Sequence, residues 1–385
     1  MSRPTILFAG GGTGGHVFPL VAVADALRAL APGVRCVFVG TARGLEAKLV
    51  PERGYELELL EVLPLRGRGV LGAARGALRA GGAVREAAVL VRRLAPRAVF
   101  SVGGYAAGPV SLAAALLGVP LALLEPNSVI GFANRLIAPL VDRAYTAFEP
   151  VERHFKAARV LRAGVPIRSG FAPAPYTATA RPFPVLVLGG SQGARSLNEV
   201  VPRALAAVGE DLAIVHQAGP RDIDAVRALY DELGIGARAR TTPFIDDMPT
   251  ALARAGLVIG RSGASAVSEI CAVGRPSILV PYPFAAGDHQ RKNALVLERE
   301  GAAETVPADR VTPEFLAGLI QRLVRDPARL EHMAAAAQRL GKPNAAATIA
   351  ADLLALAGLD LAENEAPSAA APVEPPGRAN AGRSV

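Results

Sequence analysis

The stretch Gly256 to Glu269, GLVIGRSGASAVSE, combines residue types that suit a nucleotide diphosphate. The order of its residue types, an apolar run followed by Gly and Ser, predicts a buried strand over 257–259, a tight turn over 261–263 and a helix from Ala264 onward. A helix start offers unpaired N–H groups and the positive end of the helix dipole, which suit a diphosphate, and Glu269 could accept hydrogen bonds from ribose hydroxyls. An ordinary strand–turn–helix with a surface Glu shows the same pattern, because every doubly wound domain contains several such corners.

A second candidate phosphate loop follows the first predicted strand, residues 5–8. The sequence GGGTGGHVFP, Gly10 to Pro19, precedes a helix that we expect to run to about Leu30. Glycines let the backbone approach an anion closely, while Thr13 and His16 add side-chain donors. No Gly-Lys-Ser/Thr follows, so this is not the P-loop of a phosphate-cleaving NTPase, and the dehydrogenase pattern GxGxxG fits loosely.

The segments around these loops alternate between strands and helices, which predicts an α/β fold with parallel sheets. The turn GGSQGA, Gly189 to Ala194, and a helix over 195–207 repeat the order seen at the start of the chain. Two Rossmann-like doubly wound halves are therefore expected. Their strands are predicted near 36–39, 57–60, 98–102, 121–124, 143–146 and 159–163, then 185–188, 213–217, 238–242, 257–259, 277–280 and 303–306.

The domain boundaries follow from composition. We expect an N-terminal domain over 1–163 and a C-terminal domain over 164–340, with the linker in the segment that contains Pro173, Pro175, Pro182 and Pro184. Residues 341–361 are expected to form a closing helix that packs back on the N-terminal domain. Residues 362–385, rich in Ala and Pro, cannot bury a core and are predicted to form a disordered tail.

Composition limits the class of partner. The 385 residues are 51% hydrophobic, enough for two sizeable cores. Aromatic residues make up 5% with no Trp, which argues against a nucleic-acid partner that is bound by base stacking. The net charge of +8 suits nucleotide diphosphates or anionic lipid headgroups, although a solvated basic surface would also account for it.

One segment concentrates this charge. Val62 to Leu94 holds seven arginines (66, 68, 75, 79, 85, 92 and 93) against the single acid Glu86, interleaved with apolar residues such as Leu65, Val70 and Leu71. A peripheral membrane site would have this composition, and so would a solvated helix. The residues alone leave the two interpretations open.

The two cysteines, Cys36 and Cys271, lie far apart and show no metal-ligand spacing, which favours a reducing cytoplasm. The N-terminal MSRPTILFAG is predicted to be a strand and not a signal peptide. The uncharged run 98–124 is divided by Gly and Pro into pieces too short to span a bilayer.

Taken in order, these motifs closely resemble the MurG family over roughly residues 4 to 355. Members are membrane-associated transferases that add N-acetylglucosamine from UDP-N-acetylglucosamine (UDP-GlcNAc) to undecaprenyl-diphospho-muramoyl-pentapeptide (lipid I), giving lipid II for peptidoglycan. Besides the three glycine-containing motifs, the resemblance rests on GTARGLEAKLVPERG (40–54), VGGYAAGP (102–109), GVPIR (164–168), FIDDM (244–248) and DHQRKNA (288–294).

The resemblance implies a B-type glycosyltransferase fold, with the acceptor on the N-terminal half, the donor on the C-terminal half and inverting transfer in the cleft between them. It implies no cofactor and no metal. The donor residues carried over are Thr13, Gly14, Gly15, Asn127, Arg168, Ser191, Ile245, Ala264, Ser265, Ala266, Val267, Ser268, Glu269, Gln290 and Asn293. The acceptor residues are Gly11, Gly12, Thr13, His16, Gly104 and Tyr105.

Within these roles, Ser191 and Arg168 are expected near the donor phosphates, the backbone of Ile245 against uracil, and Glu269 at the ribose. Gln290, together with Asn293, is expected to hold hydroxyls of the GlcNAc ring. Two departures from the family pattern alter this picture. Leu124 and Pro126 flank Glu125 where the family commonly has His and Gln, and Ala266 replaces a hydroxyl residue, so backbone N–H groups must take over its contact with phosphate.

Inverting transfer requires a base for the acceptor hydroxyl. His16 is the first candidate, because its unperturbed pKa of about 6.5 suits a base near neutral pH. A His at a helix start can instead cap the backbone or bind acceptor phosphate, and Glu125 is the alternative base. The only DxD motif, Asp222 to Asp224, is interpreted as a helix cap and not as a metal site, since the helix start, Arg168 and Ser191 can stabilise the departing UDP.

Two rival functions remain at this stage: a UDP-GlcNAc 2-epimerase-like enzyme, and a non-catalytic UDP-sugar sensor suggested by the altered residues around Glu125. The preferred interpretation makes UDP-GlcNAc, lipid I and an anionic membrane surface the partners, on the cytoplasmic face of the cell membrane. Other cell-wall synthesis proteins are a further class of partner.

Overall fold

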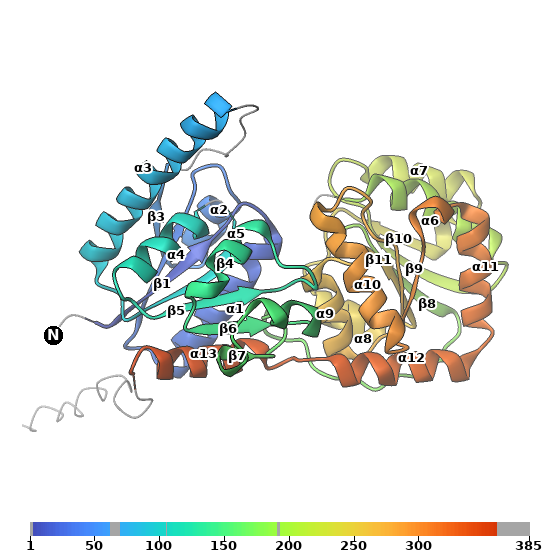
Figure 1. Cartoon of the computed structure of the whole chain (residues 1–385). Coiled ribbons are helices and arrows are strands. Elements are labelled where there is room, and N and C mark those ends of the chain that lie inside the picture. Colours follow the sequence, from blue (N-terminus) through green and yellow to red (C-terminus); the bar gives the residue numbers. More distant parts are fainter. Residues whose placement is uncertain (1–2, 62–69, 105, 191–192, 360–385) are drawn as a thin grey trace, which may run out of the picture.

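The computed structural model describes residues 3–61, 70–104, 106–190 and 193–359, with the side chains of α3 described from Gly81 onward. Two α/β domains stand side by side, each built on one parallel sheet (Figure 1). The predicted fold class is therefore correct. The predicted tail, 362–385, lies outside the described residues.

The N-terminal sheet has seven strands in the order β3-β2-β1-β4-β5-β6-β7. Strands β1, β4 and β5 are buried along their whole length, which accounts for their nearly continuous apolar sequence. The strands are β1 (Thr5–Gly10), β2 (Arg35–Gly40), β3 (Glu56–Leu59), β4 (Ala98–Gly103), β5 (Leu121–Glu125), β6 (Arg143–Thr146) and β7 (Val160–Leu161). The last is shorter than the 159–163 expected.

Side chains alternate between two cores, one on each face of this sheet. Ile6 and Phe8 point to the face covered by α1 (Gly14–Leu30) and α13 (Ala345–Leu356). Leu7 and Ala9 point to the opposite face, under α3 (Val70–Leu94), α4 (Ala107–Leu116) and α5 (Phe132–Ile137). The remaining helices of this domain are α2 (Glu46–Glu52), η1 (Ala138–Leu140), η2 (Glu149–His154) and η3 (Ala157–Arg159).

The C-terminal sheet repeats the design with six parallel strands in the order β10-β9-β8-β11-β12-β13. Its strands are β8 (Phe183–Leu188), β9 (Leu212–Gln217), β10 (Ala239–Thr242), β11 (Leu257–Gly260), β12 (Ser277–Leu279) and β13 (Ala303–Thr305). Its helices are α6 (Arg195–Ala207), α7 (Ile223–Glu232), η4 (Gly236–Arg238), α8 (Met248–Arg254), α9 (Ala264–Val273), η5 (Ala286–Asp288), α10 (His289–Arg299), η6 (Ala308–Arg310), α11 (Pro313–Val324) and α12 (Pro327–Leu340).

Both sheets reverse their strand order at the first strand. In the N-terminal sheet β1 lies between β2 and β4, and in the C-terminal sheet β8 lies between β9 and β11. The loops after these strands leave from the carboxyl edge at the point where ligands bind in doubly wound folds. The glycine-rich loops identified in the sequence are the loops after β1, β8 and β11.

The chain crosses between the domains twice. After α12 it returns to the N-terminal domain, where α13 packs against α1 beneath the first sheet (Figure 1). Asp352 of α13 accepts a hydrogen bond from the Tyr145 hydroxyl at 2.8 Å and pairs with Arg143 at 2.9 Å. The last helix thus belongs structurally to the first domain.

The proline-containing segment is not a free linker, which corrects the expectation from composition. Ile167 and Phe171 share a core with Met248 and Leu252 of the C-terminal domain. The guanidinium of Arg275, itself buried, donates hydrogen bonds to the carbonyls of Ala174 and Pro175 at 3.1 and 2.9 Å. Residues 165–182 are therefore part of the C-terminal domain.

The DxD motif occupies a helix start, as expected, but its first carboxylate does not cap the helix. Asp222 is the N-cap residue of α7 and makes no side-chain hydrogen bond to a helix amide. Its carboxylate instead accepts from the Asn198 amide at 2.9 Å. Within the described ranges, every helix is too short or too polar to cross a membrane.

Candidate active site

The glycine-rich loop after β1 leads directly into α1. Thr13 is the N-cap residue, has an extended backbone and makes no side-chain capping bond. Gly14 and Gly15 form the first two positions of the helix, where N–H groups have no intrahelical partner. Thr13 and Gly15 are exposed, so the hydroxyl and the helix start are accessible, as a diphosphate site requires.

His16 lies one turn into α1. Its Nδ1 lies 3.2 Å from the carbonyl oxygen of Gly11, and because a carbonyl only accepts, Nδ1 carries the proton and Nε2 is left as the basic nitrogen. Burial lowers the pKa of His16 below its usual value, the bond to Gly11 opposes this, nearby His289 lowers it further and Glu46 raises it. The imidazole is therefore neutral near pH 7 and can accept a proton at Nε2.

The predicted acceptor glycines are largely committed to the loop itself. A Cβ on Gly104 would lie 2.5 Å from the Gly11 carbonyl oxygen, so the loops after β1 and β4 can approach only because Gly104 lacks a side chain. The Gly12 N–H donates to Glu46 at 2.8 Å. This amide is directed into the protein, so an acceptor contact of the exposed Gly12 would have to use another of its atoms. Tyr105 lies outside the described residues.

Glu125, the alternative base, is 1% exposed at the end of β5. Its carboxylate accepts from the Asn127 N–H at 3.1 Å, the Gly131 N–H at 3.0 Å and the Asn134 amide at 2.9 Å. Burial raises the pKa of Glu125 and these hydrogen bonds oppose the rise. With both oxygens occupied by its own loop, Glu125 holds the turn 125–131 in shape, which corrects its assignment as a base.

Asn293 also differs from its predicted role. It is fully buried on α10, where its Oδ1 accepts from the N–H and the hydroxyl of Ser128 at 2.9 and 2.8 Å. Its amide nitrogen donates to Asn127 Oδ1 at 3.3 Å and to the Ser262 carbonyl at 3.2 Å. Every polar atom of this side chain joins the two domains, so it is not free to hold a sugar hydroxyl.

The donor helix α9 begins at Ala264 after the N-cap residue Gly263. The Ser265 hydroxyl is buried and has no hydrogen-bond partner among the described residues, as expected of a group that awaits a ligand. The Val267 side chain is in the core with Cys271 and Leu279, so only its backbone can contact a ligand. Ala266 and Ser268 are half-buried on the same helix.

Glu269 and Arg168 come together at this helix, with Arg168 Nη2 3.7 Å from Glu269 Oε1. Burial raises the pKa of Glu269 to about 7, against the lowering effect of Arg168. The guanidinium also lies 5.9 Å from the ring centre of Phe18 on α1. Arg168 therefore stands between the predicted ribose-binding carboxylate and the N-terminal domain.

Two other predicted donor contacts are occupied in this structure. The Ile245 N–H donates to the Gln217 side chain at 3.2 Å, which leaves the Ile245 carbonyl as its backbone group for uracil. Gln290 Oε1 accepts from the Tyr282 N–H at 3.0 Å, so its amide hydrogens are the groups that remain for a sugar. Ser191 lies outside the described residues. No three His, Cys, Asp or Glu side chains gather as metal ligands anywhere in the described ranges.

Sequence reasoning missed several residues that shape this site. Glu46 lies under the first glycine-rich loop. It belongs to the motif at 40–54, but the sequence did not predict a role for it. Arg261 donates to the carbonyls of Val280 and Pro281 at 3.0 and 2.9 Å and to the Ser196 hydroxyl at 2.7 Å, tying the donor loop to α6. Asn134, which holds Glu125, carries no local signal, because its partner is brought near only by the fold.

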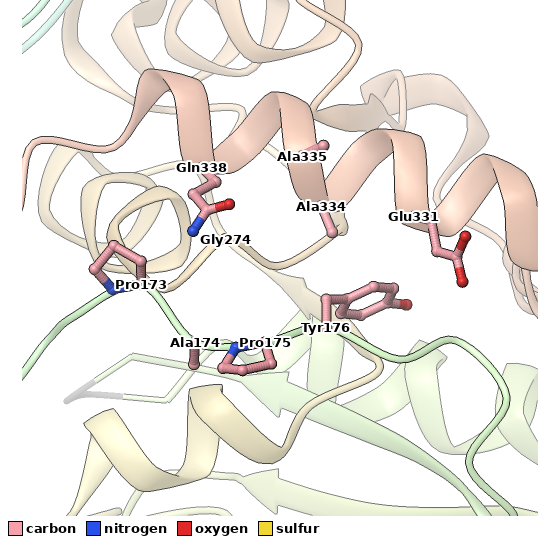
Figure 2. Close-up of a pocket in the computed structure, with 9 residues that line it drawn as sticks. All are labelled: Pro173, Ala174, Pro175, Tyr176, Gly274, Glu331, Ala334, Ala335 and Gln338. Carbon is pink, nitrogen blue, oxygen red and sulfur yellow. The ribbon is translucent and has the colours of Figure 1, made fainter.

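Two pockets lie outside these loops. One, of about 350 Å³, lies between segment 173–176 and α12 and contains Tyr176, Glu331 and Gln338 among small apolar residues (Figure 2). The other, of about 660 Å³, is shared by Asp25 and Arg53 of the first domain with Arg168–Phe171 and Asp246–Thr250 of the second. Its contact with Arg168 places it at the side of the donor site.

Comparison with known proteins agrees with this geometry. Residues 6–146 match the glycosyltransferase family 28 N-terminal domain and residues 184–349 its C-terminal domain. A UDP-N-acetylglucosamine–N-acetylmuramyl-(pentapeptide) pyrophosphoryl-undecaprenol N-acetylglucosamine transferase of Sorangium cellulosum is 56% identical over 92% of this chain and 88% of its own length. A protein of the same name from Syntrophus aciditrophicus is 40% identical over 91% and 98%.

Solved structures give the same result. The crystal structure of Acinetobacter baumannii MurG matches with a TM-score of 0.78 and 32% identity over 91% of this chain and 99% of that one. A UDP-N-acetylglucosamine 2-epimerase has a TM-score of 0.60 at 13% identity, over 92% and 97%, and shares the fold alone. With two parallel sheets, and with close relatives along nearly its whole length, the chain belongs to the MurG family of glycosyltransferases.

Proposed function

We propose that this protein transfers N-acetylglucosamine from UDP-GlcNAc to the muramoyl sugar of lipid I, giving lipid II in peptidoglycan synthesis. The observation that carries the proposal is the 56% identity to a transferase of that name over 92% of the chain. The topology supports it, because in both sheets the strand order reverses at the first strand, the point where doubly wound folds bind ligands.

The donor is assigned to the C-terminal domain. The start of α9, with the unpaired Ser265 hydroxyl, offers N–H groups and the helix dipole to the diphosphate. Glu269 lies one and a half turns further along, where a ribose attached to that diphosphate would reach it. Arg168, 3.7 Å from Glu269, supplies positive charge as UDP departs.

The acceptor is assigned to the N-terminal domain, with His16 as the base. Its Nε2 takes the proton from the acceptor hydroxyl while that oxygen attacks the anomeric carbon and the bond to UDP breaks. A neutral imidazole is required at the start of this step, and burial of His16 favours that form. The exposed Thr13 and the start of α1 would receive the acceptor diphosphate.

A single assay separates the transferase from its rivals. Purified protein is supplied with UDP-GlcNAc, with and without lipid I, and released UDP and the sugar's configuration are both measured. UDP release that depends on lipid I, with lipid II as the product, is the expected result. Epimerised sugar without lipid I would identify an epimerase, and binding without any turnover would identify a sensor.

Replacing His16 by Ala should lower kcat by about 10²- to 10⁴-fold, the usual contribution of a general base, while KM for UDP-GlcNAc changes little. The acidic limb of the pH profile of kcat should disappear with the base. Glu269→Ala is the matched comparison and should raise KM for UDP-GlcNAc. Near-normal kcat with a raised KM for lipid I would instead make His16 a ligand of the acceptor phosphate.

We also propose that the protein lies peripherally on the cytoplasmic face of the cell membrane through its N-terminal domain. The exposed apolar side chains Leu116, Phe132, Leu136 and Leu140 support this surface. α4 packs against α3, which lies within the predicted arginine-rich segment 62–94. Residues 62–69 of this segment, and the side chains of 70–80, lie outside the described part of the structure.

A further inference from the structure

Glu46, at the first position of α2, is a buried carboxylate that no part of the proposed reaction uses. It is 2% exposed and lies beneath the loops that follow β1 and β2. A Cβ on Gly11, Gly40 or Gly44 would lie 2.2, 2.3 or 2.0 Å from its side chain. Three glycines thus enclose this one carboxylate, and the enclosure leaves no room for it to take another position.

The groups that hold Glu46 are all neutral donors. Its Oε1 accepts from the N–H and the hydroxyl of Thr41 at 2.9 and 3.0 Å, and its Oε2 accepts from the Gly12 N–H at 2.8 Å. No Lys or Arg pairs with it among the described residues. Its negative charge therefore acts on the surrounding loop without a counter-ion in contact.

One peptide unit joins this carboxylate to His16. The Gly12 N–H that donates to Glu46 belongs to the same peptide group as the Gly11 carbonyl that accepts from His16 Nδ1 at 3.2 Å. In a trans peptide these two groups point in opposite directions. A carboxylate that polarises the N–H strengthens the carbonyl as an acceptor, as in any chain of hydrogen bonds.

We propose that Glu46 is a positioning residue for transfer, which orients His16 and increases its basicity through the Gly11–Gly12 peptide. The carboxylate, the peptide and the imidazole form a three-member chain that holds Nδ1–H in place and turns Nε2 toward the acceptor. As Nε2 takes the proton, the imidazolium gains the attraction of the Glu46 charge. This inference rests on the proposed role of His16 as the base.

The geometry also explains why a buried charge is tolerated close to a phosphate site. Three hydrogen bonds compensate the desolvated carboxylate. The charge is directed inward, toward the Gly12 amide, while the exposed Thr13 and Gly15 form the outer surface of the loop. The two ionisable groups near His16 act in opposite directions, since His289 lowers its pKa and Glu46 raises it.

Glu46→Gln is the direct test. Gln has the same size but one acceptor oxygen in place of two and no charge, so it cannot satisfy Thr41 and Gly12 together. We expect kcat to fall roughly tenfold and the acidic limb of its pH profile to move down by about half a unit or more, because loss of a negative neighbour lowers the pKa of an imidazole. KM for UDP-GlcNAc should not change.

Thr41→Ala is the matched control. It removes one hydrogen bond to the same carboxylate but leaves the charge and the Gly12 contact. We expect its pH profile to coincide with that of the unaltered protein. An equal shift in Thr41→Ala and Glu46→Gln would show that loosened packing causes the effect and would overturn the inference.

NMR titration separates this inference from the proposed function. The ring signals of His16, assigned by their loss in His16→Ala, should titrate at lower pH in Glu46→Gln than in the unaltered protein. If they do not, the inference fails while the base assignment stands. If they do, but His16→Ala retains normal kcat, the base assignment fails instead.

One measurement needs no Glu46 variant and can therefore be made even if the Glu46→Gln protein does not fold. The ¹⁵N shifts of the neutral His16 ring in the unaltered protein report which nitrogen carries the proton. The chain of hydrogen bonds requires the proton on Nδ1. A ring protonated on Nε2 would break the chain and overturn the inference.

Discussion

Burial acts in opposite directions on the two ionisable side chains that the proposed mechanism uses. It lowers the pKa of His16 and raises that of Glu269 to about 7, because in each case it disfavours the charged form. The consequence for His16 is favourable, since a base must begin neutral. For Glu269 the consequence is a carboxylate that is only partly ionised at neutral pH.

Binding of UDP-GlcNAc should therefore strengthen as the pH rises. A carboxylate accepts two ribose hydroxyls better than a carboxylic acid does, and with a pKa of about 7 the ionised fraction rises roughly tenfold from pH 6 to pH 8. We expect the association constant, measured by calorimetry, to increase by nearly this factor. The diphosphate diester of the ligand does not titrate in this range.

Glu269→Gln supplies the control for that measurement. It should bind UDP-GlcNAc more weakly at pH 8 and should lose most of the dependence on pH. An equal slope in the two proteins would mean that another group titrates, and Arg168 would then remain as the principal contact of this region.

The buried side chain of His216 should make the free energy of unfolding depend on pH. It is fully buried, its Nε2–H donates to Asn198 at 3.1 Å, and its Nδ1 accepts from the Tyr230 hydroxyl at 3.0 Å. Burial lowers its pKa to about 4. Since the unfolded chain takes up this proton near pH 6.5 and the folded chain does not, the free energy of unfolding should fall as pH drops from 6.5 to 4.

The loss should reach roughly 3 kcal/mol at pH 4, at 1.36 kcal/mol for each unit between the two pKa values. Urea unfolding at several pH values measures it. His216→Gln should lower stability at pH 7 but weaken the dependence on pH in this window. His332→Gln, at an exposed position of α12, should leave the curve unchanged; equal curves for all three proteins would rule out the assignment.

At the scale of elements, α4 and α5 present a surface that the sequence did not identify. Phe132 and Leu136 are separated by one helical turn and are 77% and 63% exposed. Exposed apolar groups of this kind on a basic domain suit a membrane surface. α3 makes up most of the arginine-rich segment 62–94, and it packs against α4.

Replacing Phe132 and Leu136 by Ser should weaken binding to anionic vesicles, measured by co-sedimentation, and leave turnover of a soluble acceptor analogue intact. Glu at positions 66, 68, 75 and 79 should also release the protein, since each Arg near an anionic surface contributes about 1 kcal/mol. Phe284→Ser is the matched control, because Phe284 is 82% exposed in the C-terminal domain. If Phe284→Ser alone released the protein from vesicles, the membrane surface would lie on the C-terminal domain and the proposed surface would be wrong.

In the whole molecule, Asn293 makes a fully buried polar contact between the two domains. Its four hydrogen bonds join α10 to Ser128, Asn127 and Ser262. Asn127 and Ser128 belong to the turn that Glu125 organises, and a Cβ on Gly287 would lie 3.7 Å from Val129 of this turn. This buried polar contact joins the two domains together with Phe148, which shares a core with Val267 and Leu279 of the C-terminal domain.

Asn293→Ala should open the cleft, since it leaves the buried Ser128 N–H without its partner at a cost of about 1–3 kcal/mol. We expect a larger radius of gyration by X-ray scattering, a lower melting temperature and a lower kcat/KM for both substrates. Ser128→Ala loses the hydroxyl bond alone and should show smaller changes. A raised KM for UDP-GlcNAc with unchanged scattering and melting would restore Asn293 to its predicted role as a sugar ligand.

The order and type of the elements could be predicted from the sequence, and so could the loops that carry the candidate site. Strand–helix alternation, apolar runs and glycine-rich turns are local patterns, and nearly every predicted strand lies within a residue or two of its observed bounds. A loop between a buried strand and a helix must leave from the carboxyl edge of a parallel sheet. The positions of Thr13, His16, Ser265 and Glu269 on such loops and helices were therefore readable in advance.

The tertiary structure alone shows which polar groups of the candidate site are already hydrogen-bonded within the protein. Glu46 meets Gly12 across 34 residues, and Ser128 meets Asn293 across 165. Such partners come together through packing of whole domains, and no local pattern encodes them. A buried polar side chain must find a partner somewhere, and these distant contacts give Asn293 a structural role and link Glu46 to His16 through the Gly11–Gly12 peptide. The partners of Glu125 lie within nine residues of it, but only the folded turn shows that they occupy both of its oxygens.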